Sequence, residues 1–304
     1  MNGERYKIYD IYAEKPEQQR YKINLILFLL TLCTTLLAGA FYEGADIVNR
    51  PDEILRGVPF ALTLMGILMG HELGHYILSE YHNVTATLPY FIPAPVFPGT
   101  ISVGTFGAFI KMKSPFTTSS TLLDIGVAGP LFGTILAIPV FAYGIATSRV
   151  MPVAALPEGY QSITLGSSLI LYGIERIFAG EIPAGSQIFL NSIGYAGLIG
   201  LFVTSLNLIP IGQLDGGHIS YALFGRGWHR WISRFAFILL FVLGFKGWTG
   251  WLVWAFLGLL IGFRHPQPVY PFEPLDRKRK ILGIVGIILF VLSFIPEPIK
   301  LTLR

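Results

Sequence analysis

The sequence predicts an all-α, polytopic membrane protein with about seven membrane-spanning helices. The 304 residues are 53% hydrophobic and only 13% charged, whereas a soluble domain usually carries about 25% charged residues. The apolar residues lie in long runs, and a membrane helix needs about 20 such residues in succession. The basic residues lie at the edges of these runs, as membrane anchors do, and form no nucleic-acid-like patch. A lipid bilayer is therefore an expected partner, and nucleic acid is not.

Seven apolar runs define the predicted spans in chain order. The first four are long enough to cross a bilayer and cover Ile23–Tyr42, Val58–Tyr81, Leu122–Ile145 and Ile188–Ile209. The last three are shorter and cover Trp231–Phe245, Trp248–Phe263 and Ile281–Ile295. Lys246 and Gly247 predict a hairpin turn between the fifth span and the sixth.

The positive charges predict an orientation for these spans. Lysine and arginine gather in the N-terminal tail and in the loops before the third span, after the fourth and before the seventh. With seven spans, all of these segments fall on one side. Because basic loops stay in the cytoplasm, we expect residues 1–22 to form a cytoplasmic tail and residues 23–304 a single transmembrane domain. The tail is polar from its start, so a cleavable signal peptide is not expected.

Two segments interrupt the helical pattern. Leu88–Lys113 contains four prolines followed by three glycines, and it cannot form one regular helix. Its second half alternates in the manner of a β-strand. Thr147–Ser186 is a linker of about 40 residues with an amphipathic stretch at Leu165–Phe178.

A metal-binding pattern lies inside the second apolar run. His71, Glu72 and His75 stand in the order H-E-x-x-H, which places both imidazoles on one face of a helix, within reach of one zinc ion. Glu72 beside them can take a proton from water during hydrolysis. Ionisable groups at membrane depth usually face a cavity and have a function, although polar residues can also seal contacts between helices.

A third ligand is predicted after the fourth apolar run. A catalytic zinc site needs three protein ligands. Pro210 should end the fourth helix, and Asp215 then follows in a glycine-flanked turn that can aim its carboxylate inward. The predicted topology places His71 and Asp215 at the same depth in the membrane.

These paired motifs resemble those of the site-2 protease family of intramembrane metalloproteases. The resemblance rests on HELGH at residues 71–75 and on NLIPIGQLDGG at residues 207–217. Further support comes from GTFGA at residues 104–108, which resembles a segment of prokaryotic and plastid members, and from AGP at residues 128–130. The match covers the chain from about Val58 to Tyr221.

The resemblance implies a zinc-dependent protease that cleaves membrane-spanning protein substrates. It makes His71, His75 and Asp215 the ligands of Zn2+. It makes Glu72 the catalytic acid and base, and it suggests that Asn207 positions the substrate or stabilises the oxyanion. The linker is too short for the PDZ domain of some members, and no CBS domain is expected. The chain thus resembles a minimal member, expected in the plasma membrane of a prokaryote, with a catalytic core at about residues 58–221.

The proline-rich segment is the expected binding place of the substrate. Irregular backbone at membrane depth survives only where it is buried in protein or lines a wet cavity. A free strand edge there could add the substrate as a further strand, which would hold the peptide extended. Val103, Thr105 and Phe109 are the predicted contact residues. A solvent-exposed linker without substrate contact is the alternative.

Other functions and other roles stay open at this point. A transporter could use the histidines and Glu72 as an ion site, but it would need polar or broken positions in several spans. A catalytically dead regulator is a second alternative, and a zinc enzyme with a glutamate as third ligand is another. His229 and His265 lie beside arginines and are expected at the headgroups. The tryptophans that flank the spans predict an aromatic belt and comprise Trp228, Trp231, Trp248 and Trp251.

Overall fold

The computed structural model describes residues 21–97, 102–153 and 162–302. Most of these residues are helical. The helices are α2 (Tyr21–Tyr42), η1 (Pro51–Gly57), α3 (Val58–Tyr81), α4 (Ser119–Thr147), α5 (Leu169–Phe178), α6 (Ser192–Asn207), α7 (Asp215–Lys246), α8 (Gly250–Ile261) and α9 (Arg277–Ser293). Most of the predicted cytoplasmic tail lies outside the described residues.

Among the described residues, four helical segments are long and apolar enough to cross a membrane. They are α2, α3 together with η1, α4, and α7. The helices α6 and α8 are apolar but shorter, with 16 and 12 residues. The polytopic architecture is therefore confirmed, whereas the number of seven crossings stays a prediction.

Two predicted spans have other boundaries in the structure. The fourth run begins as a β-strand and becomes helical only at Ser192. The fifth span is the second part of α7, a helix of 32 residues that starts at Asp215 and has a kink at Gly225. Gly225 has a φ of 75°, a conformation that glycine adopts without steric cost. Apolar periodicity could locate the lipid-facing part of α7 but not its polar first turns.

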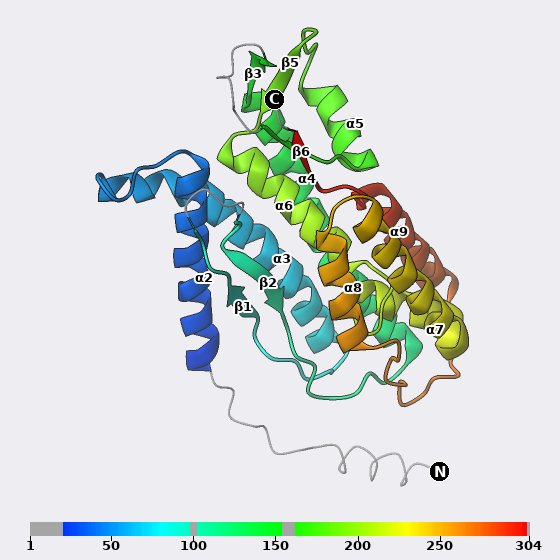
Figure 1. Ribbon diagram of the computed structural model, residues 1–304. Coiled ribbons are helices and arrows are strands. Elements are labelled where there is room, and N and C mark those ends of the chain that lie inside the picture. The colour runs from blue at the N-terminus through cyan, green and yellow to red at the C-terminus, as the bar shows by residue number, and fades with distance from the viewer. Residues whose placement is uncertain (1–20, 98–101, 154–161, 303–304) are drawn as a thin grey trace.

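In the part of the chain that the structure describes, three small antiparallel sheets, each of two strands, accompany the helices (Figure 1). They pair β1 (Tyr90–Pro93) with β2 (Thr105–Phe109), β3 (Arg149–Pro152) with β5 (Ser186–Phe189), and β4 (Ser162–Leu165) with β6 (Ile299–Thr302). The first sheet confirms the strand predicted within Leu88–Lys113. The other two correct the all-α prediction: they join segments far apart in the chain, and no local pattern announces such pairing.

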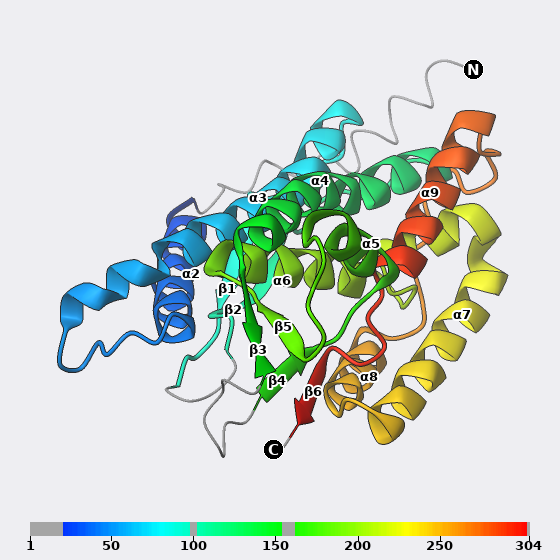
Figure 2. The same ribbon diagram turned by 90° about the horizontal axis from the view of Figure 1, so that it is seen from above.

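Helix α4 is the central helix of the bundle: it packs against α3, α6 and α7, while α3 and α6 also contact each other (Figures 1 and 2). Glycines allow the close approach, as small residues do between membrane helices. A Cβ on Gly74 of α3 would lie 2.8 Å from the carbonyl oxygen of Ala128 in α4. A Cβ on Gly144 of α4 would lie 2.1 Å from the Cα of Gly194 in α6. These contacts hold α3, α4 and α6 in fixed positions relative to one another.

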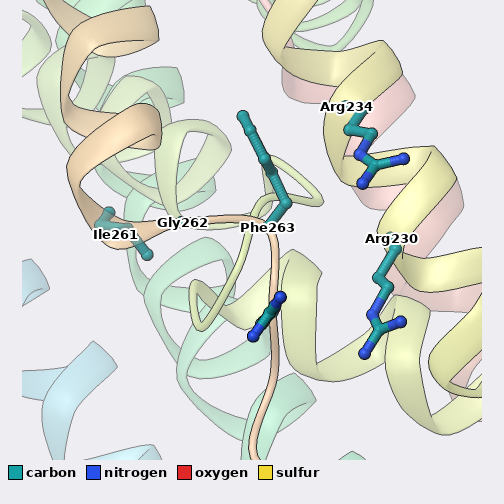
Figure 3. Close-up of a pocket in the computed structure, with 6 residues that line it drawn as sticks. Arg230, Arg234, Ile261, Gly262 and Phe263 are labelled. Atoms are coloured by element: carbon teal, nitrogen blue, oxygen red, sulfur yellow. The ribbon is translucent and has the colours of Figure 1, made fainter.

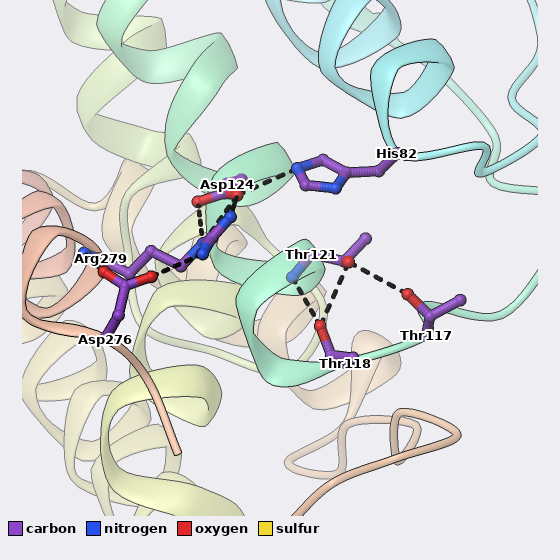
Figure 4. Close-up of polar contacts among 7 residues, drawn as sticks. All are labelled: His82, Thr117, Thr118, Thr121, Asp124, Asp276 and Arg279. Atoms are coloured by element: carbon purple, nitrogen blue, oxygen red, sulfur yellow. Dashed lines mark hydrogen bonds and ion pairs between the residues drawn. The ribbon is translucent and has the colours of Figure 1, made fainter. Parts of the chain in front are cut away.

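A polar cluster joins the ends of α3, α4 and α9 (Figure 4). Asp124 in the first turns of α4 accepts hydrogen bonds from the guanidinium of Arg279, with Nη2 to Oδ2 at 2.7 Å. His82, at the end of α3, lies 3.0 Å from the same carboxylate. Asp276 caps α9 by accepting a hydrogen bond from the Arg279 amide. The cluster ties the start of α9 to the central helix.

Candidate metal centre

Helix α3 carries the first part of the site. His71, Glu72 and His75 are buried, with 3%, 4% and 6% of their surface exposed. The two histidines are one turn apart and therefore lie on the same face. As predicted, the pattern H-E-x-x-H stands on a long apolar helix. Buried ionisable groups in such a helix need partners, and the chain supplies one from α7.

The turn between α6 and α7 carries the second part. Helix α6 ends at Asn207, before Pro210, and α7 begins at Asp215. Close packing requires glycine at the start of α7: a Cβ on Gly216 would lie 1.9 Å from the carbonyl oxygen of Leu208. The tight turn brings the Asp215 carboxylate back toward α3, as the sequence predicted.

Three ligand atoms converge in the space between α3 and α7. The atoms are Nε2 of His71, Nε2 of His75 and Oδ2 of Asp215, and each pair is 3.2 Å apart. Such a triangle of nitrogen and oxygen atoms suits a single metal ion, and these residues form a candidate metal group. The ring of His75 is held from behind, because its Nδ1 donates a hydrogen bond of 2.8 Å to the carbonyl oxygen of Ile125.

Two glycines of α4 make room for the histidine rings. A Cβ on Gly129 would lie 2.1 Å from Nε2 of His75, and a Cβ on Gly133 would lie 3.0 Å from Nδ1 of His71. The motif AGP at residues 128–130 thus has a local cause, which is space for an imidazole at the metal position. This role cannot be recognised from the sequence, because it depends on how α4 packs against α3.

Asn207 and Glu72 lie beside the convergent atoms. The side-chain amide nitrogen of Asn207 is 3.2 Å from Nε2 of His71. Glu72 faces the same charged groups, and its carboxylate is within reach of the backbone amide of Ile110. Ile110 directly follows β2, so the end of the β1–β2 hairpin is close to Glu72.

The predicted contact residues of the hairpin have different surroundings. Thr105 is 5% exposed, and its hydroxyl donates to the carbonyl oxygen of Ile92. Val103 packs against an apolar core cluster. Phe109 is 47% exposed and stacks on Tyr90. Strand alternation alone would have placed Thr105 and Phe109 on one face.

A bulge explains this departure from alternation. The register shifts so that Ile92 pairs with Gly107 and Pro93 with Thr105, which leaves Phe106 as the extra residue. Phe106 is 71% exposed, and sequence reasoning did not select it. The exposed aromatic residues of β2 are therefore Phe106 and Phe109.

A second group of histidines lies near the turn between α6 and α7. His218 Nδ1 and His265 Nε2 are 2.6 Å apart, and His265 Nδ1 donates to the carbonyl oxygen of Pro266. Burial lowers the pKa of His265, so the ring is neutral near pH 7 and its Nε2 accepts the proton of His218. The expectation that His229 and His265 contact headgroups is wrong, because they are only 0% and 7% exposed. The residues that pack against His229 and His265 come from separate segments of the chain.

Comparison with known proteins gives the family. The model of peptidase family M50 matches residues 59–245, which include the histidines of α3 and Asp215. The chain belongs to peptidase family M50. As expected for this family and for the apolar helices, the M50 chain is an integral membrane protein. The transporter hypothesis receives no support from this membership.

Named relatives of this M50 chain occur in plants. It is 31% identical over 301 residues to the probable zinc metalloprotease EGY1, chloroplastic, of Arabidopsis thaliana, covering 91% of this chain and 53% of the relative. It is 28% identical over 282 residues to the probable zinc metalloprotease EGY2, chloroplastic, of the same plant, covering 90% and 48%. The chain therefore spans about half the length of these relatives. No solved structure matches the chain.

Proposed function

We propose that this chain is a zinc metalloprotease that hydrolyses a peptide bond within or near the membrane-spanning segment of a substrate protein. The observation that carries the proposal is the convergence of His71, His75 and Asp215 beside Glu72, inside a bundle of apolar helices. Membership of a peptidase family and the similarity to probable zinc metalloproteases of plants support the reaction class.

The three convergent residues fit zinc. Ligand atoms about 2.0 to 2.1 Å from a tetrahedral zinc ion lie about 3.3 to 3.4 Å from one another. The separations of 3.2 Å are close to that value. Two histidines and one carboxylate are also a common donor set of catalytic zinc, which leaves one position open. When bound, zinc would polarise the scissile carbonyl and make water nucleophilic near neutral pH.

The protein groups beside the metal position would handle the protons and the developing charge. Glu72 would take a proton from the attacking water and pass it to the leaving amine. Asn207 would donate a hydrogen bond from its side-chain amide to the oxyanion. The amide lies beside the metal position, since it is 3.2 Å from Nε2 of His71.

Hydrolysis by the purified full chain should depend on zinc. A tagged substrate with one membrane span is incubated with the protein before and after treatment with a chelator. Cleavage should fall to the background after chelation and return when zinc is added back, because the open metal position activates the water. Magnesium is the matched addition and should not restore cleavage, since it prefers oxygen ligands. Cleavage that resists complete removal of the metal would refute the proposed reaction.

We further propose that the substrate binds along β2 as an added strand. Within the described residues, β2 pairs on one side only, with β1. Its end leads to Ile110, next to Glu72. An extended peptide on the free edge would exchange main-chain hydrogen bonds with β2, which offsets part of the cost of unwinding a substrate helix. The scissile carbonyl could then approach the metal position.

The bulge makes this binding mode testable by crosslinking. Single cysteines replace Phe106, Phe109 or Thr105 in the Cys33→Ser, Glu72→Gln background. Phe106→Cys and Phe109→Cys should give substrate adducts because these positions are exposed, whereas the buried Thr105→Cys is the control and should give none. Equal adducts from all three positions would contradict the proposal. So would the absence of adducts from both phenylalanine positions while substrate co-purifies with the protein.

We also propose the predicted topology of seven crossings with the N-terminus in the cytoplasm. The distribution of lysine and arginine supports this orientation. The helices α6, α8 and α9 would be the short crossings. A plasma membrane of a prokaryote stays a prediction, and the chloroplastic names belong to the relatives.

A further inference from the structure

Three arginines line one hollow between α7 and the end of α8 (Figure 3). Arg230 and Arg234 are one turn apart on α7, and Arg264 follows α8. The hollow has a volume of about 480 Å³, and its other lining residues are Ile261, Gly262 and Phe263. Gly262 has a φ of 82°, and this turn lets the chain after α8 run back past α7. The lining thus combines three guanidinium groups with apolar groups and backbone.

Three guanidinium groups give the hollow a concentrated positive charge. Within the described part of the chain, none of the three arginines forms an ion pair with a carboxylate within 4.0 Å. The guanidinium of Arg234 lies over the ring of Trp231, at 5.1 Å from the ring centre. Arginine stays charged at every physiological pH, so the three groups repel one another unless an anion lies between them. The charge of the hollow therefore favours an anionic ligand.

The side chains around the hollow indicate that the anion would come from the surface of a lipid bilayer. On one side of the hollow, α7 and α8 present exposed apolar side chains; examples are Phe235 at 69%, Ile238 at 56% and Leu260 at 67%. On α7, Trp228 and Trp231 are exposed by 70% and 66%. Exposed tryptophan beside an apolar helix face is typical of the boundary between hydrocarbon and headgroups. These side chains favour a position of the hollow at the boundary between hydrocarbon and headgroups.

We propose that this hollow binds the phosphate group of an anionic glycerophospholipid, with the acyl chains along the exposed face of α7 and α8. Guanidinium groups bind phosphate oxygens by paired, charge-assisted hydrogen bonds, and three of them can surround one phosphate. A net negative headgroup satisfies the charge of the site, whereas the choline of a zwitterionic headgroup would bring a fourth positive charge. The proposal requires the membrane location of the chain and does not rest on its protease activity.

Lipid binding to the purified full chain tests this assignment. Phosphatidylglycerol is titrated into the protein in neutral detergent, and bound lipid is counted by native mass spectrometry. One lipid should bind tightly to the wild type. The triple variant R230Q/R234Q/R264Q should bind it about a hundredfold more weakly, since each surface arginine contributes about fivefold. The single variant R264Q should lose about fivefold and is exposed enough to leave the fold intact.

A second triple variant is the matched control. R277Q/K278Q/K280Q removes the same charge from exposed positions at the start of α9, outside the hollow. It should change the affinity by less than about threefold, because salt screens charges that do not contact the lipid. Equal losses in both triple variants would show a general charge effect and would overturn the assigned site. An unchanged affinity in R230Q/R234Q/R264Q would overturn it as well.

Two further probes separate the possible sources of the phosphate. Phosphatidylcholine with the same acyl chains should bind at least about tenfold more weakly than phosphatidylglycerol, because it has no net negative charge. Inorganic phosphate alone should compete only at far higher concentration, since it lacks the apolar contacts. Equal binding of both lipids, or displacement of phosphatidylglycerol by phosphate at similar concentration, would overturn the lipid assignment.

Discussion

Replacing Glu72 by glutamine should lower the rate of peptide hydrolysis by about 10²-fold to 10⁴-fold, which is the usual contribution of a general acid and base. Glutamine has nearly the same size and keeps an acceptor oxygen for the backbone amide of Ile110. It cannot take a proton from water, however, so the step that creates the nucleophile is lost. The content of bound zinc should stay near one ion per chain, because Glu72 is not one of the convergent ligand residues.

Glu80→Gln is the matched control for this substitution. Glu80 lies on the same helix and is exposed, away from the buried part of the site. Its replacement should leave both the rate and the zinc content unchanged. Wild-type turnover in Glu72→Gln would refute the proposed mechanism. Loss of folded protein or of zinc in that variant would instead assign Glu72 a structural role.

Much of the site follows from local sequence patterns. The spacing of His71 and His75 sets their common face in any helix, and the apolar run makes that helix a membrane span. Pro210 predicts the end of α6, and the glycines around Asp215 predict a tight turn. These rules act over a few residues, which is why α3 has the predicted bounds and α6 ends before Pro210. Asp215, which was predicted in a turn, is instead the first residue of α7.

Features that depend on distant neighbours could not be predicted in the same way. The burial of His229 and His265 arises because α7 and the segment after α8 pack together. The need for Gly129 appears only when α4 is placed against His75. The bulge at Phe106 depends on the pairing of β2 with β1, which shifts exposure by one residue. Each of these is a tertiary effect with no signal in the periodicity of one segment.

Replacing Asp215 by alanine should remove most of the bound zinc. Two histidines would remain on α3, and a catalytic zinc site needs three protein ligands. The purified variant should therefore hold well below one zinc ion per chain after dialysis, and hydrolysis should fall to the background. Asn207→Ala is the matched control, because its side chain lies 3.2 Å from His71 without belonging to the metal group. This control should keep its zinc but hydrolyse more slowly, by about 10²-fold to 10³-fold, as expected for a lost oxyanion donor.

The position of Asp215 requires one further comparison. Asp215 starts α7, and a carboxylate in the first turn also stabilises a helix through its dipole. The unfolding temperature of Asp215→Ala should therefore be compared with that of the metal-free wild type. The two temperatures should be close if loss of the metal accounts for the lower stability of the variant. Full zinc occupancy in Asp215→Ala would exclude this residue from the site. If Asn207→Ala lost zinc to the same extent, zinc loss in Asp215→Ala would not distinguish a ligand from a neighbouring residue. The assignment of three ligands would then lose its support. Retention in Asn207→Ala together with loss in Asp215→Ala is the result that the three equal separations of 3.2 Å predict.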